Sequence, residues 1–209
     1  MIRTIDRLLC RCSSVWRSLR HNTRFRSALG YEPTLWTRKV ADQAVRTLVS
    51  GLTPSRASML EVSGTVWANF GFLEYVSASF PEFDICKNRL DRRFDLIIAE
   101  HVFEHLARPD MAVRNILEML KPGGHFLIVT PFLYKVHPCP IDCYRWTEAG
   151  LSQFLSTAGF TNLMTGSWGN RACILATFKR EYILYNRYLH SVHNEPEYPV
   201  VVWALARKP

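Results

Sequence analysis

Short apolar runs alternate with helical patterns downstream of the Pro54-Ser55 break. This alternation is typical of a parallel sheet whose strands are joined by crossover helices. The pattern predicts strands near Ser58 to Val62, Glu74 to Ala78, Phe94 to Ala99, His125 to Thr130, Thr161 to Gly166 and Val200 to Ala206. We therefore expect a doubly wound, Rossmann-like α/β fold.

Two helices of this domain carry start and stop signals. Pro109 and Asp110 open the first helix, and the run Lys121-Pro122-Gly123-Gly124 ends it. Thr147 is placed to cap the second helix, which Gly159 stops.

The N-terminal part has a different pattern of apolar and polar residues. Residues 1–26 approximate an apolar helical stripe with arginines on the other face, and a second helical pattern runs from Pro33 to Leu52. We expect residues 1–53 to form a helical extension or lid and residues 54–209 the catalytic domain. Three roles stay open for residues 1–26: a helix packed on the domain, peripheral contact with an anionic membrane, or an organellar targeting segment.

Composition narrows the function classes. The chain has 209 residues and a net charge of +8, but seven arginines and one aspartate in residues 1–26 account for +6 of it. A nearly neutral body argues against nucleic acid as a partner. No apolar run is long enough to span a membrane, and six scattered cysteines favour free thiols in the cytoplasm. The oligomeric state is left open.

The first predicted strand ends in Glu61, and the small residues Ser63, Gly64 and Thr65 follow it. Ligands of open α/β sheets bind outside the carboxyl ends of the strands. An acid there can hold an ammonium group or a ribose hydroxyl, and small residues let the backbone approach a ligand. An ordinary strand-to-helix turn is the alternative interpretation.

Three later motifs carry a family resemblance. They are Phe94-Asp95-Leu96-Ile97-Ile98-Ala99-Glu100-His101 with Glu104-His105, then Leu120-Lys121-Pro122-Gly123-Gly124, and then Thr130-Pro131. Their order and spacing resemble class I S-adenosylmethionine (SAM)-dependent methyltransferases of the small-molecule type, over about residues 60–160. The resemblance implies SAM as cofactor and a reversed last strand. It also implies that Glu61, Ser63, Gly64 and Thr65 surround the methionine end of SAM, with Ala99, Glu100 and His101 beneath the sulfonium.

The chain departs from this family in two places. Ser63, Thr65 and Trp67 stand where the family usually has three spaced glycines. Ser79 stands where the family usually has the acid that binds the ribose, and a serine is a weaker anchor than a carboxylate. We expect Asp84 to supply the missing carboxylate.

A second group of polar residues lies between His137 and Thr147, in a loop that is expected to cover the acceptor site. His137 is the candidate for acceptor contact or proton removal. Asp142 is a further catalytic candidate, although pairing with Arg145 to brace the loop is an alternative. Cys139 and Cys143 with His137 do not complete a zinc set.

His101, Glu104 and His105 have the spacing of one helical face. That face could bind a divalent metal, as some members of the family do at this spacing, but a structural role for Glu104 and His105 is the simpler hypothesis. We expect no metal, with His101 as a polar contact or base near the transferred methyl. The predicted function is SAM-dependent methylation of O or N on a small metabolite or sugar-containing intermediate. The alternative is a non-catalytic or SAM-binding interaction protein on the same fold.

Overall fold

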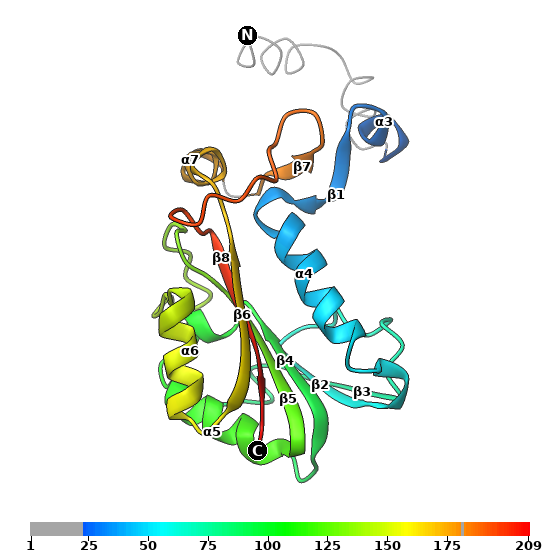
Figure 1. Ribbon diagram of the computed structural model, residues 1–209, viewed down its shortest axis with the longest axis vertical. Helices are drawn as coiled ribbons and strands as arrows, with labels where there is room; N and C mark the ends of the chain where they lie inside the picture. The colour runs from blue at the N-terminus through cyan, green and yellow to red at the C-terminus, as the bar shows by residue number, and fades with distance from the viewer. Residues whose placement is uncertain (1–22, 181) are drawn as a thin grey trace.

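The computed structural model describes residues 23–180 and 182–209. Within these residues, six strands form one sheet in the order β3-β2-β4-β5-β8-β6 (Figure 1). The strands of this sheet are β2 (Ser58–Val62), β3 (Glu74–Ala78), β4 (Phe94–Glu100), β5 (Leu120–Pro131), β6 (Thr161–Trp168) and β8 (Val201–Arg207).

The predicted strands are confirmed, and so is the reversed last strand. β2 is parallel to β3 and β4, and β4 is parallel to β5. β8 runs antiparallel to both β5 and β6. β5 begins five residues earlier than expected, because Leu120 pairs with Phe94, and the register shifts across Lys121 to Gly124 before His125 pairs with Leu96.

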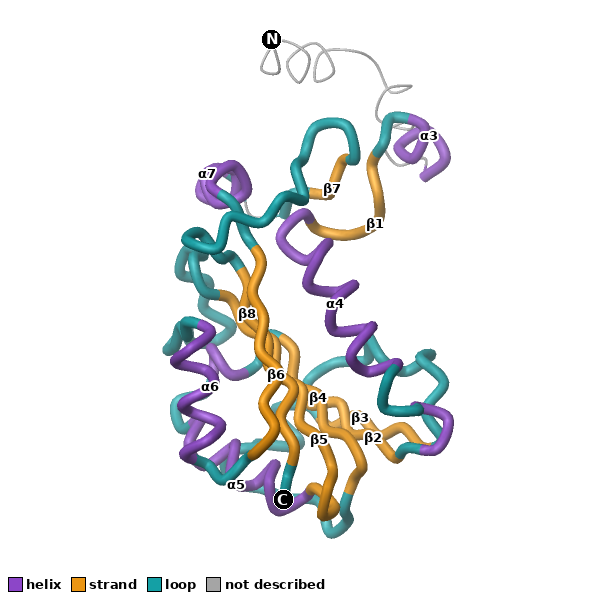
Figure 2. The backbone as a smooth tube through the Cα atoms, viewed as in Figure 1, coloured by secondary structure: helices purple, strands orange, loops and turns teal. Residues whose placement is uncertain are grey.

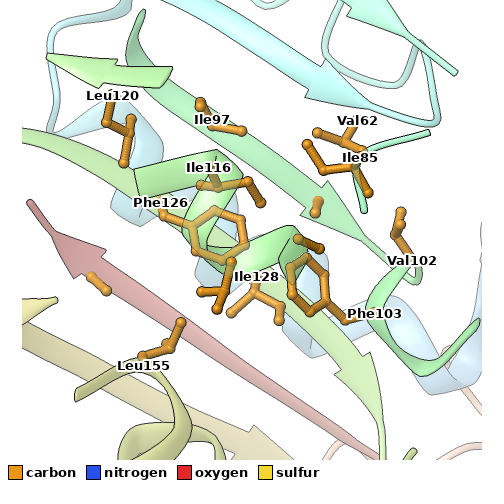
Figure 3. Packing of buried hydrophobic residues seen from close by; sticks show 14 of the residues in the cluster. Val62, Ile85, Ile97, Val102, Phe103, Ile116, Leu120, Phe126, Ile128 and Leu155 are labelled. Carbon is orange, nitrogen blue, oxygen red and sulfur yellow. The ribbon is translucent and has the colours of Figure 1, made fainter. Parts of the chain in front are cut away.

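Helices cover both faces of the sheet, as a doubly wound fold requires (Figures 1 and 2). α5 (Pro109–Met119) and α6 (Glu148–Thr157) pack on one face, where Ile116, Leu155 and Phe126 share a buried core (Figure 3). α4 (Lys39–Ser50) packs on the other face with Val45 and Val49 in a second core. Thr147 caps α6 as expected, because its Oγ1 accepts a hydrogen bond from Gly150 N at 3.0 Å.

Crossover helices are missing from two connections of the sheet. Residues 63–73 and 79–93 form turns instead of the helices that the fold class predicts. In the first connection, Glu61 accepts the backbone N–H groups of Val66 and Trp67, and the Trp67 side chain is buried beneath α4. α4 therefore covers the face that a helix after β2 would otherwise protect.

The N-terminal extension differs from the expected long helix. Residues 31–35 form strand β1 (Tyr31–Leu35), which pairs antiparallel with β7 (Leu184–Asn186). The predicted helix from Pro33 was therefore wrong in its first turn, since tertiary pairing holds this segment extended. A 3-10 turn, η1 (Trp36–Arg38), leads into α4, and α3 (Thr23–Ala28) precedes β1.

The remaining elements are α7 (Arg171–Lys179) and the 3-10 turns η2 (Pro54–Arg56) and η3 (Phe103–His105). Neither α7 nor β7 was predicted. The hypotheses for residues 1–26 concern a segment of which residues 1–22 lie outside the described residues. Among the residues that the structure describes, no helix is long and apolar enough to cross a membrane.

Candidate functional site at the carboxyl edge of the sheet

The carboxyl ends of β2, β4 and β5 lie side by side. The parallel register pairs Val62 with Ala99, and Ala99 with Ile128. The turn after Glu61, the Glu100-His101 segment and the loop after Pro131 therefore leave the sheet along one edge. This edge is where an open α/β sheet binds its ligands.

Glu61 organises the turn after β2. Its Oε1 accepts a hydrogen bond from Val66 N at 2.8 Å, and its Oε2 accepts bonds from Trp67 N at 3.0 Å and Tyr75 Oη at 2.7 Å. Burial and the neighbouring Glu61 carboxylate raise the pKa of Tyr75 to about 12. Tyr75 therefore stays a neutral donor at physiological pH, and the buried Glu61 carboxylate is well satisfied.

The turn itself has the shape of a backbone cradle. Ser63 adopts a left-handed φ of 58°, a conformation that usually favours glycine. A Cβ at Gly64 would lie 2.5 Å from Glu61 Oε1, so no side chain fits there without a shift. Ser63 and Thr65 are exposed beside it. These features fit a cofactor that approaches the backbone at this point.

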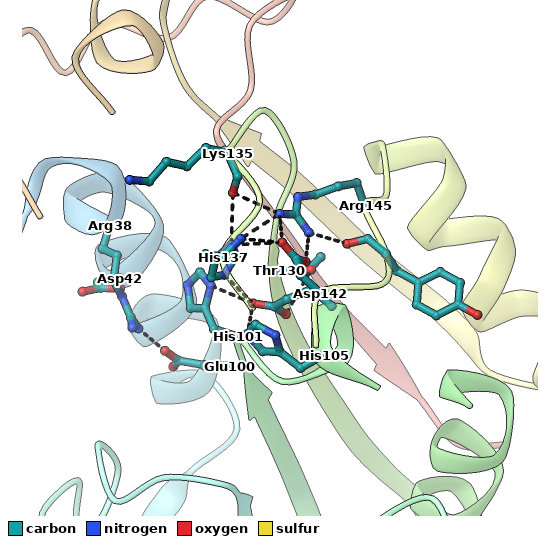
Figure 4. A network of polar contacts seen from close by, with 12 residues as sticks. Arg38, Asp42, Glu100, His101, His105, Thr130, Lys135, His137, Asp142 and Arg145 are labelled. Atoms are coloured by element: carbon teal, nitrogen blue, oxygen red, sulfur yellow. Dashed lines mark hydrogen bonds and ion pairs between the residues drawn. The ribbon is translucent and has the colours of Figure 1, made fainter. Parts of the chain in front are cut away.

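Glu100 is held by two residues that the sequence did not identify as partners. Its Oε1 accepts a hydrogen bond from Trp67 Nε1 at 2.7 Å, and its Oε2 pairs with Arg38 (Figure 4). Trp67 stands at one of the positions where the family usually has glycine. This substitution was the one feature of the sequence that could have singled out Trp67 as a site residue. Arg38 comes from η1, so the N-terminal extension reaches the carboxyl edge of the sheet.

Three other expected cofactor residues lie at or near this edge, with different contacts. Ala99 is buried in β4. Ser79 follows β3, is partly buried, and its carbonyl accepts Phe83 N at 2.9 Å. Asp84 accepts a hydrogen bond from Cys86 N at 3.0 Å and pairs with Lys87, and these contacts lower its pKa against the opposing effect of burial. Asp84 therefore orders its own turn.

His101 has a strained backbone at the end of β4. Its φ of 54° is uncommon for a residue other than glycine, and its backbone N donates to Val129 O at 2.8 Å. The side-chain Nε2 is buried and has no hydrogen-bond partner in the part of the chain that the structure describes. Strain of this kind is often retained at functional sites.

His137 has partners that the sequence did not reveal. Its backbone N donates to Asp142 Oδ2 at 2.8 Å, and its Nδ1 lies 3.4 Å from the same oxygen. Arg145 Nη2 donates to Asp142 Oδ2 at 2.7 Å. The Arg145 guanidinium lowers the pKa of Asp142 to about 2, so Asp142 is a carboxylate that braces the loop and orients His137.

The side chains of His101, His105 and His137 lie close together at this edge (Figure 4), and the Glu104 carboxylate lies near all three. The Glu104 side chain is fully buried, and its Oε1 lies 3.5 Å from His101 Nδ1, 3.6 Å from His105 Nε2 and 3.9 Å from His137 Nε2. The main-chain oxygen of Glu104 accepts Cys143 N at 2.7 Å, which fastens the loop to η3. The structure thus groups His137 with Glu104 and His105.

Comparison with known proteins supports the same fold and family. A family profile described as "Methyltransferase domain" matches residues 16–166. A probable S-adenosylmethionine-dependent methyltransferase of Mycolicibacterium smegmatis is 32% identical over 98 residues, which cover 41% of this chain and 38% of that protein. An uncharacterized protein of Mycobacterium tuberculosis is 35% identical over 68 residues, covering 30% of this chain and 23% of that protein. The matches thus span well under half of these curated relatives.

Solved structures share the fold at low sequence identity. The N-methyltransferase NodS of Bradyrhizobium japonicum, in complex with S-adenosylhomocysteine, superposes with a TM-score of 0.50 at 16% identity, covering 80% of this chain and 87% of NodS. A phosphoethanolamine N-methyltransferase of Haemonchus contortus, in complex with S-adenosylmethionine, superposes with a TM-score of 0.51 at 13% identity. This match covers 80% of this chain and 52% of the Haemonchus chain. The chain belongs to the methyltransferase domain family of class I SAM-dependent methyltransferases, whose methyl donor is S-adenosylmethionine.

Proposed function

We propose that this chain transfers a methyl group from SAM to an oxygen or nitrogen of a small metabolite or sugar-containing intermediate. One observation carries the proposal: the exposed turn at Ser63 to Thr65, the buried Glu104 and the histidines around it lie on one edge of the sheet. SAM supplies an electrophilic methyl group on a sulfonium, so the protein mainly aligns the two reactants and accepts a proton.

The cofactor residues of this proposal come from the turns after β2, β3 and β4. Ser63, Gly64 and Thr65 offer backbone groups to the methionine end, and Glu61 keeps that turn in shape through its bonds to Val66 and Trp67. Ser79 and Asp84 serve the adenosine end. Ala99 and Glu100 line the floor at the end of β4.

The acceptor residues come from β4 and the loop after β5. His101 is the proposed proton acceptor, because its buried Nε2 has no partner within the described structure. His137 contacts the acceptor, and Asp142 holds His137 in place. Asp142 acts through His137, since its own carboxylate is committed to Arg145.

The N-terminal extension is proposed to close the site. Arg38 in η1 already pairs with Glu100. β1, which pairs with β7, directly precedes η1 in the chain (Figure 1). A lid of this kind excludes water and orders the acceptor pocket.

The experiment is a screen of metabolite extracts with methyl-labelled SAM. The proposal expects label in a small molecule that depends on the intact chain and is strongly reduced with the His101→Asn variant. Label that appears in RNA, DNA or protein and in no small molecule would contradict the acceptor class.

A non-catalytic interaction protein is the second candidate. One observation favours it: Trp67 and Arg38 take up both oxygens of Glu100 at the place where the family holds its cofactor. A chain that binds SAM tightly and methylates nothing in the same screen would support this candidate.

A further inference from the structure

We infer that Glu104, His105 and His137 form a binding site for one divalent transition-metal ion. Each offers a ligand atom, and the three atoms lie within 4.8 Å of one another. Glu104 and His105 come from η3, whereas His137 comes from the loop after β5. The sequence spacing of His101, Glu104 and His105 therefore named two of the three residues but missed His137.

The buried carboxylate is the first observation that points to a ligand. Glu104 is 0% exposed, and its Oε1 has no hydrogen-bond partner within residues 23–180 and 182–209. Its other oxygen has Thr130 Oγ1 at 3.4 Å. A buried carboxylate oxygen without a donor is strongly disfavoured unless a cation compensates it. The distances of 3.6 Å to His105 Nε2 and 3.9 Å to His137 Nε2 are too long for hydrogen bonds.

Those separations suit a shared ion instead. Two ligand atoms bound to one tetrahedral zinc ion lie about 3.4 Å apart, from metal distances of about 2.1 Å. The carboxylate-to-imidazole separations exceed this spacing by only a few tenths of an ångström. The two imidazole nitrogens lie within 4.8 Å of each other, so binding of one ion would require the rings to rotate toward it.

The outer contacts of the two histidines give a second, independent observation. His105 Nδ1 lies 2.6 Å from Ile141 O, which requires the proton on Nδ1, so in the neutral ring Nε2 carries the lone pair on the side of Glu104. His137 Nδ1 lies 3.2 Å from Lys135 O and 3.4 Å from Asp142 Oδ2. Histidine ligands usually donate their second ring N–H to such a carbonyl or carboxylate.

Arg145 does not oppose this arrangement of the His137 ring. Its Nη2 lies 3.3 Å from His137 Nδ1, but it also donates to Asp142 Oδ2 at the shorter distance of 2.7 Å. The Asp142 carboxylate, with a pKa of about 2, is ionised at neutral pH and accepts that donation. His137 Nδ1 can therefore keep its own proton for Lys135 O, with Nε2 directed to the cluster.

Two imidazoles and one carboxylate favour zinc, iron, cobalt or nickel over magnesium. Three protein ligands leave at least one coordination position for an exogenous group. This inference deepens the proposed acceptor site, because His137 would then contact the acceptor through the ion. It also replaces the expectation of metal-independent activity. Metal binding itself requires neither SAM nor turnover, so the two proposals can fail separately.

The experiment is a titration of the metal-stripped full chain with Zn²⁺ and, in parallel, with Co²⁺. We expect one ion per chain, and at least a hundredfold weaker binding in the His105→Gln and His137→Gln variants. The matched control is His193→Gln, which makes the same change at an exposed histidine and should bind as the unmodified chain does. Thermal melting by circular dichroism checks that each variant is folded.

A spectroscopic measurement on the unmodified chain keeps the test independent of variant folding. Co²⁺ bound by imidazole and carboxylate gives visible ligand-field bands without the near-ultraviolet charge-transfer band of a thiolate. Zn²⁺ should shift the ring nitrogen resonances of two histidines and leave His193 unchanged. The inference is overturned by the absence of binding, by a thiolate band, or by unchanged affinity in folded His105→Gln and His137→Gln chains.

Discussion

Glu61 and Glu104 are both buried glutamates at the same edge of the sheet, but their surroundings differ. Glu61 receives three hydrogen bonds from the turn that follows it and from Tyr75. Glu104 has one oxygen without a hydrogen-bond donor among the described residues, although three imidazoles face it. All the polar contacts of the first carboxylate come from neighbouring groups, whereas the second has an oxygen without a donor among the residues that the structure describes.

This difference separates scaffold from site. A satisfied buried acid stabilises a loop, whereas an unsatisfied one marks where a ligand or ion is expected to bind. The part of the edge proposed to bind SAM is therefore shaped mainly by backbone groups. The part proposed to bind the methyl acceptor is shaped by side chains. The predictions below test that division, from the largest expected effect to the smallest.

Replacing His101 should have the largest effect on turnover. His101→Asn keeps a residue type that tolerates the left-handed backbone and removes the imidazole. We expect kcat to fall by about two to four orders of magnitude, the usual contribution of a proton acceptor, with SAM affinity unchanged. Steady-state kinetics with an identified acceptor and calorimetry measure the two effects. Equal kcat in a folded variant would remove His101 from the chemistry.

Replacing Glu61 should weaken both SAM binding and the stability of the fold. Glu61→Gln leaves at least one backbone N–H of the Val66 and Trp67 pair without an acceptor. We expect the free energy of unfolding to fall by about 1 to 3 kcal/mol, with weaker SAM binding. Urea unfolding measures the first effect, and Glu82→Gln is the control because Glu82 is exposed. Unchanged stability would show that Glu61 does not organise the turn.

The periodic parts of the chain were predictable from sequence because local pattern and global fold agree there. The strand Ser58–Val62 carries three apolar residues and is buried throughout, and Thr147 and Gly159 delimit α6 by simple capping chemistry. The extended segment Tyr31–Leu35 was not predictable, since its partner β7 lies about 150 residues downstream. Long-range pairing of this kind leaves no local signal.

The site was predictable in its parts and not in its assembly. The sequence identified His101, Glu104 and His105 as one group and His137 separately, but only the fold brings the loop after β5 against η3. The contacts of Trp67 and Arg38 with Glu100 were not predictable either, because nothing in the local sequence pattern of these two residues indicates them.

Substitution of Gly64 should weaken donor binding with a smaller effect than the changes above. A valine side chain at Gly64 would press on Glu61 Oε1 and on any ligand that approaches the turn. We expect at least tenfold weaker SAM binding, about 1.4 kcal/mol. Gly64→Ala should give an intermediate loss. Calorimetry on variants with an unchanged circular dichroism spectrum measures the effect, and equal affinity in all three chains would separate the turn from the cofactor.

The Asp142 carboxylate should make a small, pH-dependent contribution to stability. Arg145 lowers its folded pKa to about 2, below the ordinary value of 3.8. Its contribution is therefore fully present above pH 4 and is lost as the pH falls from 4 toward 2. We expect the unmodified chain to lose about 1 kcal/mol more than Asp142→Asn over this range, a value reduced for solvent screening. Parallel acid dependences in denaturant unfolding would contradict the ion pair.

Removing residues 1–26 should affect turnover more than SAM binding if the extension closes over the acceptor pocket. Liposome co-sedimentation that disappears on truncation, with catalysis intact, would instead support a membrane contact for this segment.

Titration of the unmodified chain with SAM and with S-adenosylhomocysteine tests the central claim most directly. The account predicts saturable binding of one molecule of either compound per chain, measured by calorimetry, and competition between the two. It also predicts that bound SAM protects the Ser63 to Thr65 amides from hydrogen exchange. The absence of binding at millimolar SAM in a folded chain would contradict the assignment of a methyl-transfer function to this edge of the sheet.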